Sequence, residues 1–279
     1  IGSVKNTQKI TRAMKLVAAA KFARANAAVT AARPYGTAFQ AMVERLVAAA
    51  GEGFSSPLLA ATQEEKSLLV LLATDRGFCG SLNSNLFKHS LGFINSKRRE
   101  GVHVELVTWG RRAKQFGSKT GLEVHAPRER VLERPSYSLA LELADELIGK
   151  FGENGFDRVY LGFVEFKSAM SQQPKFVQVL PVGKAVKEVE TPETQIDIIV
   201  EPSVETVLKQ VLKREVAGLI FRAMLEGAAS EHGARMTAMD SATNNANEVL
   251  RRMKIQYNRA RQAAITKELI EITSGAQAL

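Results

Sequence analysis

Proline is confined to the middle of this chain, and this distribution constrains the fold more than any other feature. All eight prolines lie between Pro34 and Pro202. Because proline removes a backbone donor and clashes inside a helix, the two ends of the chain are free to form long helices. Both ends are also rich in alanine, lysine, arginine and glutamate, which are good helix formers.

A helix from Ser203 to Thr273 would be about 105 Å long, and one from Ser3 to Ala50 about 70 Å. Ser203 follows a Glu-Pro pair and suits the N-cap position. Pro34 is expected to kink the first helix or to end its first half. Since most helical stability in proteins comes from packing, each long helix needs a partner along its length. We expect the two ends to pair with each other, antiparallel, because the chain must return between them.

Small side chains recur at spacings of three and four in both ends, which is typical of a coiled-coil seam. The expected seam positions are Val4, Thr7, Thr11, Met14, Ala18, Lys21, Ala25, Ala28 and Ala32, and in the C-terminal segment Met239, Ala242, Ala246, Val249, Met253, Tyr257, Ala260 and Ala264. Such a seam buries little area. The pattern is typical of a plain helical hairpin or of a slim shaft surrounded by other proteins.

The middle of the chain alternates strand-like and helix-like segments, which predicts an α/β layer with a largely parallel sheet. The expected strands are Ser67–Thr74, Val102–Trp109, Asp157–Phe166, Phe176–Val182 and Ile196–Val200, and the expected helices are Asn83–Arg99, Arg111–Ser118 and Tyr137–Phe151. We therefore predict the α/β class: a long antiparallel coiled coil of the N- and C-terminal helices with an inserted Rossmann-like α/β domain. The predicted divisions are residues 1–55 for the first helix, 66–200 for the α/β domain and 203–279 for the last helix.

The net charge of +9 is concentrated near the N-terminus. Residues 1–50 carry eight basic side chains and one acidic side chain, Glu44. By itself such a segment is typical of a transit peptide, a nucleic-acid arm or a helix facing an acidic partner. A second basic patch lacks the interleaved aromatics usual in nucleic-acid binding, which favours a solvated face; it comprises Arg98, Arg99, Arg111, Arg112 and Lys114.

The sequence predicts no catalytic, cofactor or metal site. The turn from Thr74 to Asn83 contains two glycines but neither GxGxxG nor GxxxxGK[ST], so a structural turn is favoured over a phosphate-binding one. Its lone Cys79 has no nearby His or Asp signature. The four histidines have no metal-ligand spacing, and three carboxylates of the C-terminal helix are expected to be isolated and solvated: Glu231, Asp240 and Glu248. No apolar run is long enough to span a membrane.

Three strings resemble the gamma subunit of F-type ATP synthases, in that family's order and across essentially the whole chain. They are SVKNTQKITRAMKLVAAAKFARA at the N-terminus, TDRGFCGSLN after the first strand, and ASEHGARMTAMDSATNNANEV with QYNRARQAAITKELIEITSGAQAL at the C-terminus. The resemblance implies a non-catalytic central rotor stalk without cofactors. Its coiled coil would enter a ring of three alpha and three beta subunits, and its α/β foot would touch the epsilon subunit and the membrane c-ring.

The resemblance also implies a bacterial complex on the cytoplasmic face of the inner membrane, where proton flow drives rotation and ATP synthesis, and no nucleic-acid partner. Residues are expected to precede Ile1, and the single Cys79 argues against thiol regulation. By motif, the expected contacts with the catalytic hexamer are Met14, Arg235, Arg261, Gln262, Thr266 and the tip at Leu279. The expected contacts with epsilon and the ring are Ile198, Val200 and Glu201.

Two other classes of function remain as alternatives. A stand-alone α/β enzyme would use the Thr74–Asn83 turn and Cys79, and would lose activity in Cys79→Ala. A basic coiled-coil protein that binds nucleic acid would show a strongly salt-dependent affinity for DNA.

Overall fold

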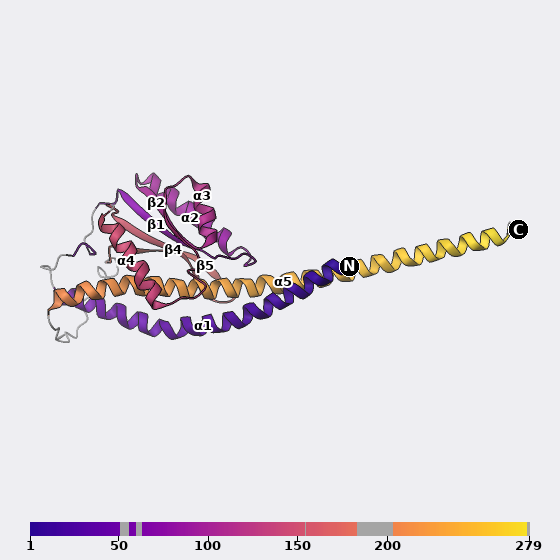
Figure 1. Cartoon of the computed structure of the whole chain (residues 1–279), viewed down its shortest axis with the longest axis horizontal. Helices are drawn as coiled ribbons and strands as arrows, with labels where there is room; N and C mark the ends of the chain where they lie inside the picture. The colour runs from indigo at the N-terminus through magenta and orange to yellow at the C-terminus, as the bar shows by residue number, and fades with distance from the viewer. Residues whose placement is uncertain (51–55, 60–62, 154, 183–202, 278–279) are drawn as a thin grey trace.

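A computed structural model describes residues 1–50, 56–59, 63–153, 155–182 and 203–277 (Figure 1). Two long helices, α1 (Gly2–Ala50) and α5 (Val204–Gln277), run side by side, and an α/β domain lies against one part of α5 (Figure 1). The helices are antiparallel, since Thr11 contacts Thr243 and Val43 packs in one cluster with Leu212. The predicted fold class is confirmed. No helix in the described ranges is both long and apolar enough to cross a membrane.

Both long helices begin and continue for local reasons. The Ser203 hydroxyl accepts a hydrogen bond from the Thr206 amide at 3.3 Å, which satisfies one of the free amides at the start of α5. Pro34 lies inside α1, so α1 continues through it instead of ending there. The predicted strand at Ile196–Val200 lies outside the described residues.

The α/β domain contains five described strands in the order β3-β2-β1-β4-β5. The pairs β1–β2, β1–β4 and β2–β3 are parallel, whereas β4–β5 is antiparallel. The strands are β1 (Lys66–Leu72), β2 (His103–Trp109), β3 (Val124–Arg128), β4 (Arg158–Phe166) and β5 (Gln172–Leu180). The helices between them are α2 (Leu82–Arg99), α3 (Arg111–Thr120) and α4 (Tyr137–Glu153).

Strand β3 was not predicted. It has five residues, one of them Pro127, and none of its side chains is fully buried. Proline cannot donate to a sheet ladder and occurs mainly on edge strands. The edge position of β3 therefore explains why it lacks the continuous apolar run that made β1 easy to predict.

The sheet is covered on both faces. Leu68, Val70 and Leu72 of β1 pack against α4 and α5, while Leu69 and Leu71 face α2 and α3. This alternation follows from the period of two in a strand, and it explains why β1 is apolar throughout. Helix α5 is thus both half of the coiled coil and one wall of the α/β domain.

The predicted seam is right in part. Thr11, Ala18, Met239 and Ala246 are buried, as predicted. Six other predicted positions are exposed, so their assignment to the seam was wrong: Thr7, Lys21, Val249, Tyr257, Ala260 and Ala264. Phe22 and Val29 face inward in the part of α1 around Lys21 instead. The Phe22 ring lies 5.6 Å from that of Phe166 in the α/β domain, and Val29 packs in the same cluster as Phe166. The buried positions Thr11, Ala18 and Val29 are spaced by seven and then eleven residues, because α1 contacts the domain as well as α5 there.

Candidate functional site

The C-terminal part of α5 extends beyond the start of α1 and runs alone (Figure 1). Every side chain from Lys254 to Ser274 is exposed. The segment from Lys254 to Gln277, which we call the projecting helix, is about 36 Å long at 1.5 Å per residue. Its exposed large apolar side chains are Ile255, Tyr257, Ile265, Leu269, Ile270 and Ile272. A lone helix that exposes so many apolar groups is typical of a surface that another protein covers.

The root of the projecting helix is strongly basic. Residues 251–261 contain five basic side chains and no acidic one: Arg251, Arg252, Lys254, Arg259 and Arg261. The neighbouring start of α1 adds exposed basic residues, among them Lys5, Lys9 and Arg12. The resulting collar of positive charge suits a partner that presents carboxylates.

The sequence-predicted contact residues separate into groups. Arg261, Gln262 and Thr266 lie exposed and close together on the projecting helix. Met14 lies half-buried on α1, within the paired part of the shaft. The structure does not describe Ile198, Val200, Glu201 or Leu279.

Arg235 lies elsewhere, at a joint between α5 and the α/β domain. Its Nη2 is 2.7 Å from Glu231 Oε1, and the two side chains are only 11% and 10% exposed. Nε and Nη2 of Arg235 also donate to the Gly77 carbonyl, at 3.3 and 3.2 Å. The arginine thus ties the turn that follows β1 to the shaft.

The turn itself is held by its own side chains. The Asn83 amide donates to Thr74 Oγ1 at 2.8 Å, and Thr74 Oγ1 donates to the Arg76 carbonyl at 2.7 Å. Asp75 Oδ1 accepts hydrogen bonds from the amides of Arg111 and Arg130, each at 3.0 Å. Arg111 begins α3, so the aspartate occupies the place where a helix N-terminus could otherwise receive a phosphate.

Cys79 does not have the surroundings of a nucleophile. Its side chain is buried and accepts a hydrogen bond from Asn83 Nδ2 at 3.3 Å. Burial raises the pKa of the thiol, despite the opposing effect of Arg235. Reactive cysteines need a lowered pKa and access to solvent, so the geometry favours the structural turn over the enzyme alternative.

Burial favours the neutral form of two ionisable groups at the joint, Glu231 and His232. Burial raises the pKa of Glu231, although Arg235 opposes the shift. Burial, together with Arg235 and Lys21, lowers the pKa of His232 to about 4. A polar cavity of about 270 Å³ adjoins them, with Asp75 also in its lining.

The expectation that Glu231, Asp240 and Glu248 are isolated was wrong, and the expectation that they are solvated fails only for Glu231, which is buried. Glu231 pairs with Arg235, Asp240 lies 2.6 Å from Lys15 Nζ, and Glu248 pairs with Arg252. The Glu231–Arg235 and Glu248–Arg252 pairs have the i, i+4 spacing that favours such contacts on a helix, which is the signal that could have identified them. The contact with Gly77 has no such signal, because it joins residues 158 positions apart.

Comparisons with known proteins identify relatives of this chain. A family model described as ATP synthase matches residues 1–279. The chain is 44% identical over 279 residues to the ATP synthase gamma chain of Geobacter metallireducens, covering 100% of this chain and 96% of that relative. It is 43% identical over 281 residues to the ATP synthase gamma chain of Trichlorobacter lovleyi, with the same coverage. Among solved structures it is similar to the central stalk and c-ring of the Tetrahymena thermophila mitochondrial ATP synthase, with a TM-score of 0.63 and 25% identity over 84% of this chain and 99% of that one.

Proposed function

Because this chain belongs to the ATP synthase gamma-chain family, we infer that it is the central stalk of an F-type ATP synthase. It is a non-catalytic subunit of the enzyme complex and transmits rotation during ATP synthesis. The observation that carries this function is the projecting helix, whose apolar side chains have no partner among the described residues. An enclosing ring of catalytic subunits would cover those side chains. The basic collar would face carboxylates of the ring subunits.

Three of the proposed contacts with the ring lie on the projecting helix. We propose that three alpha and three beta subunits surround it, and that Arg261, Gln262 and Thr266 hydrogen-bond a loop of beta. Their exposure on one short stretch of a lone helix supports this assignment. Leu279 at the tip would enter an apolar bearing, and Met14 would face a beta loop from α1.

The α/β domain is the proposed foot. It would contact the epsilon subunit and the membrane ring, with Ile198, Val200 and Glu201 among the contact residues. Rotation of the ring by proton flow would then be passed to α5, since α5 forms part of the core of the foot. The complex would lie on the cytoplasmic face of a bacterial inner membrane, with this chain as a peripheral component.

We propose two roles for Arg235: a contact with an acidic loop of beta, which the family resemblance implies, and a structural role at the joint. Its bonds to Glu231 and to the Gly77 carbonyl support a brace between the foot and the shaft. A brace at this joint would keep the foot from turning independently of α5 under torque.

Reconstitution with cognate alpha and beta subunits tests the function. We expect one copy of this chain for three alpha–beta pairs, and sustained ATP hydrolysis only when the chain is present. Gln262→Ala should slow hydrolysis severalfold, whereas Gln173→Ala, an exposed glutamine of the foot, should not. A chain that fails to associate and leaves hydrolysis unchanged would overturn this function and favour the enzyme alternative. Tight salt-dependent binding of the chain to DNA would favour the nucleic-acid alternative.

The same assay can include Arg235→Ala. If this variant destabilises the isolated chain, Arg235 acts as a brace. If it leaves the isolated chain unchanged but slows hydrolysis, Arg235 acts through beta.

A further inference from the structure

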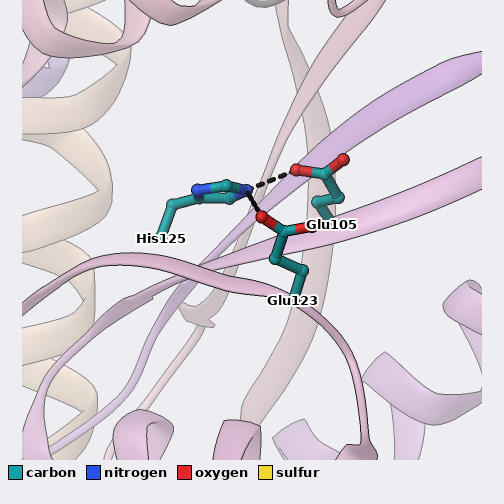
Figure 2. Close-up of side chains that lie close together, drawn as sticks. All are labelled: Glu105, Glu123 and His125. Carbon is teal, nitrogen blue, oxygen red and sulfur yellow. Dashed lines mark hydrogen bonds and ion pairs between the residues drawn. The ribbon is translucent and has the colours of Figure 1, made fainter.

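A cluster of metal-ligating side chains lies at the sheet edge formed by β2 and β3. Glu105 comes from β2, His125 from β3, and Glu123 immediately precedes β3. Figure 2 shows both carboxyl groups lying toward the same nitrogen of the His125 ring. His125 Nε2 bonds to Glu105 and lies 3.6 Å from Glu123 Oε1, and the three ligand atoms all lie within 4.8 Å of one another.

Strand register brings these residues together. Leu106 pairs with Val124, so the residues on either side of this pair project to the opposite face of the sheet. The two segments read His-Val-Glu at 103–105 and Glu-Val-His at 123–125. Each places one histidine and one carboxylate on a common face. His103 Nε2 lies 3.5 Å from Glu105 Oε1 but outside the group of three, and its exposed ring would have to turn to supply a fourth ligand.

This set of donors matches a known chemistry. Zinc takes imidazole nitrogens and carboxylate oxygens, usually four of them in a tetrahedron. We propose that Glu105, Glu123 and His125, completed by His103, bind one divalent transition-metal ion of the zinc type. These ligands are brought together across paired strands, whereas the sequence-based expectation of no metal site rested on spacing along the chain.

Glu105 is the anchor of the site. The Glu105 side chain is only 5% exposed. The side chains of Glu123 and His103 are largely exposed and can turn toward a bound ion. Hydrogen bonds from Lys66 and His125 hold the Glu105 carboxyl group in place, one on each oxygen.

A lysine already neutralises this carboxylate. Lys66 Nζ lies 2.7 Å from Glu105 Oε1, and it also lies 4.7 Å from the centre of the Phe156 ring. His125 faces the other oxygen, Glu105 Oε2, so a metal ion bound there would share the carboxylate with the ammonium group and be repelled by it. The ring of Phe156 holds the ammonium group from its other side, because a cation is attracted to an aromatic face.

The consequence of binding would be local. A metal ion would join the edge strand β3 to β2 near the point where their register shifts, between Val107 and Trp109. The side chains of β3 are otherwise only partly buried or exposed. Metal binding should therefore raise the thermal stability of the foot, because a ligand that binds only the folded state stabilises it.

Calorimetric titration of the untagged full-length chain with Zn²⁺ tests the site, with Mg²⁺ as the comparison ion. We expect one Zn²⁺ per chain and a rise in the unfolding temperature. His125→Ala and Glu105→Gln should each weaken binding at least about tenfold, since removing even an outer hydrogen-bond partner of a metal ligand costs that much. His89→Ala, an exposed histidine of α2, is the matched control and should bind like the parent chain.

Lys66→Met gives the sharpest result, because it should tighten Zn²⁺ binding by removing the repelling cation. Fluorescence of Trp109, which is fully buried in the sheet, verifies that each variant is folded. If Glu105→Gln fails this check, His125→Ala, with Co²⁺ as a visible probe of tetrahedral coordination, still decides the matter. No saturable binding by the folded parent chain, or equal affinity in the parent and His125→Ala, would overturn the proposal.

Discussion

Two stretches of the same helix, α5, lie in opposite environments. Nine successive residues of α5, from Ala223 to Glu231, are buried, so that this part of the helix is enclosed on all sides. Twenty-one successive residues, from Lys254 to Ser274, are exposed. The buried stretch lies where α5 passes between α1 and the sheet, and the exposed stretch is the projecting helix (Figure 1).

The difference shows that one helix can be stabilised by tertiary packing in one stretch and by helix propensity in another. The enclosed stretch contains small residues such as Gly227 and Ala229, because larger ones would not fit. A Cβ atom on Gly227, for example, would lie 3.1 Å from the Leu132 side chain. The projecting helix has no such neighbours and relies on good helix formers, and on the partners proposed above.

The paired part of the shaft between these stretches is intermediate in character. Its contacts are polar as well as apolar: Thr243 donates to Thr11 at 2.8 Å, Lys15 pairs with Asp240, and Gln8 bonds to Asn247. Hydrogen bonds of this kind fix the register of two helices but contribute little net stability. Stability should therefore fall along α5 from the foot to the tip.

The largest expected effect is at the foot. Ile220 is fully buried and belongs to the same core cluster as Trp109. Ile220→Ala should lower the free energy of unfolding by about 3 kcal/mol, from the lost burial and the cavity left behind. Urea unfolding followed by Trp109 fluorescence measures this value. A loss below about 1 kcal/mol would contradict the view that α5 is an integral wall of the foot.

The next effect concerns pH at the joint. The pKa of His232 is lowered to about 4 by burial, Arg235 and Lys21. Between pH 7 and pH 5 the unfolded chain therefore takes up a proton at His232 that the folded chain does not. Stability rises with pH in this window, so His232 should cost about 2 kcal/mol as the pH falls from 7 to 5.

Glu231 acts in the opposite direction, because its pKa is raised and its protonated form is favoured in the folded state. The two contributions must therefore be separated by a variant. The free energy of unfolding in urea should be measured at pH 7 and pH 5 for both chains. It should fall less between the two pH values in His232→Gln than in the parent chain. Parallel pH profiles for the two chains would show that His232 is not held neutral.

A smaller effect is expected in the paired shaft. Thr243→Val keeps the shape of the side chain but removes the donor to Thr11, and should cost about 1 kcal/mol. In the double variant with Thr11→Val both hydroxyls are absent, so its cost should be less than the sum of the two single costs. The measurement is thermal unfolding followed by circular dichroism. Additive costs would mean that the two hydroxyls do not interact.

How much of this could be predicted from the sequence depends on the range of the contacts. The long helices follow from the distribution of proline, and β1 from its apolar run. The brace of Arg235 on Gly77 could not be predicted, because no local pattern indicates which turn a distant helix will contact. Lys21 was misplaced for a related reason: a seam counted for two helices ignores a third surface, here the one around Phe166.

The smallest effect on stability, and the sharpest test of the comparison, is at the tip. Ile265 is 48% exposed on the projecting helix, whereas Ile220 on the same helix is fully buried. Ile265→Ala should change the free energy of unfolding of the isolated chain by less than about 0.5 kcal/mol, as is usual for surface positions. In the complex with alpha and beta subunits the same change should weaken association, because Ile265 would then lie in an interface. If Ile265→Ala destabilised the isolated chain as much as Ile220→Ala, the tip would have to fold against the chain itself. If it affected neither the isolated chain nor the complex, the exposed apolar face of the projecting helix would not be the surface that the partner covers.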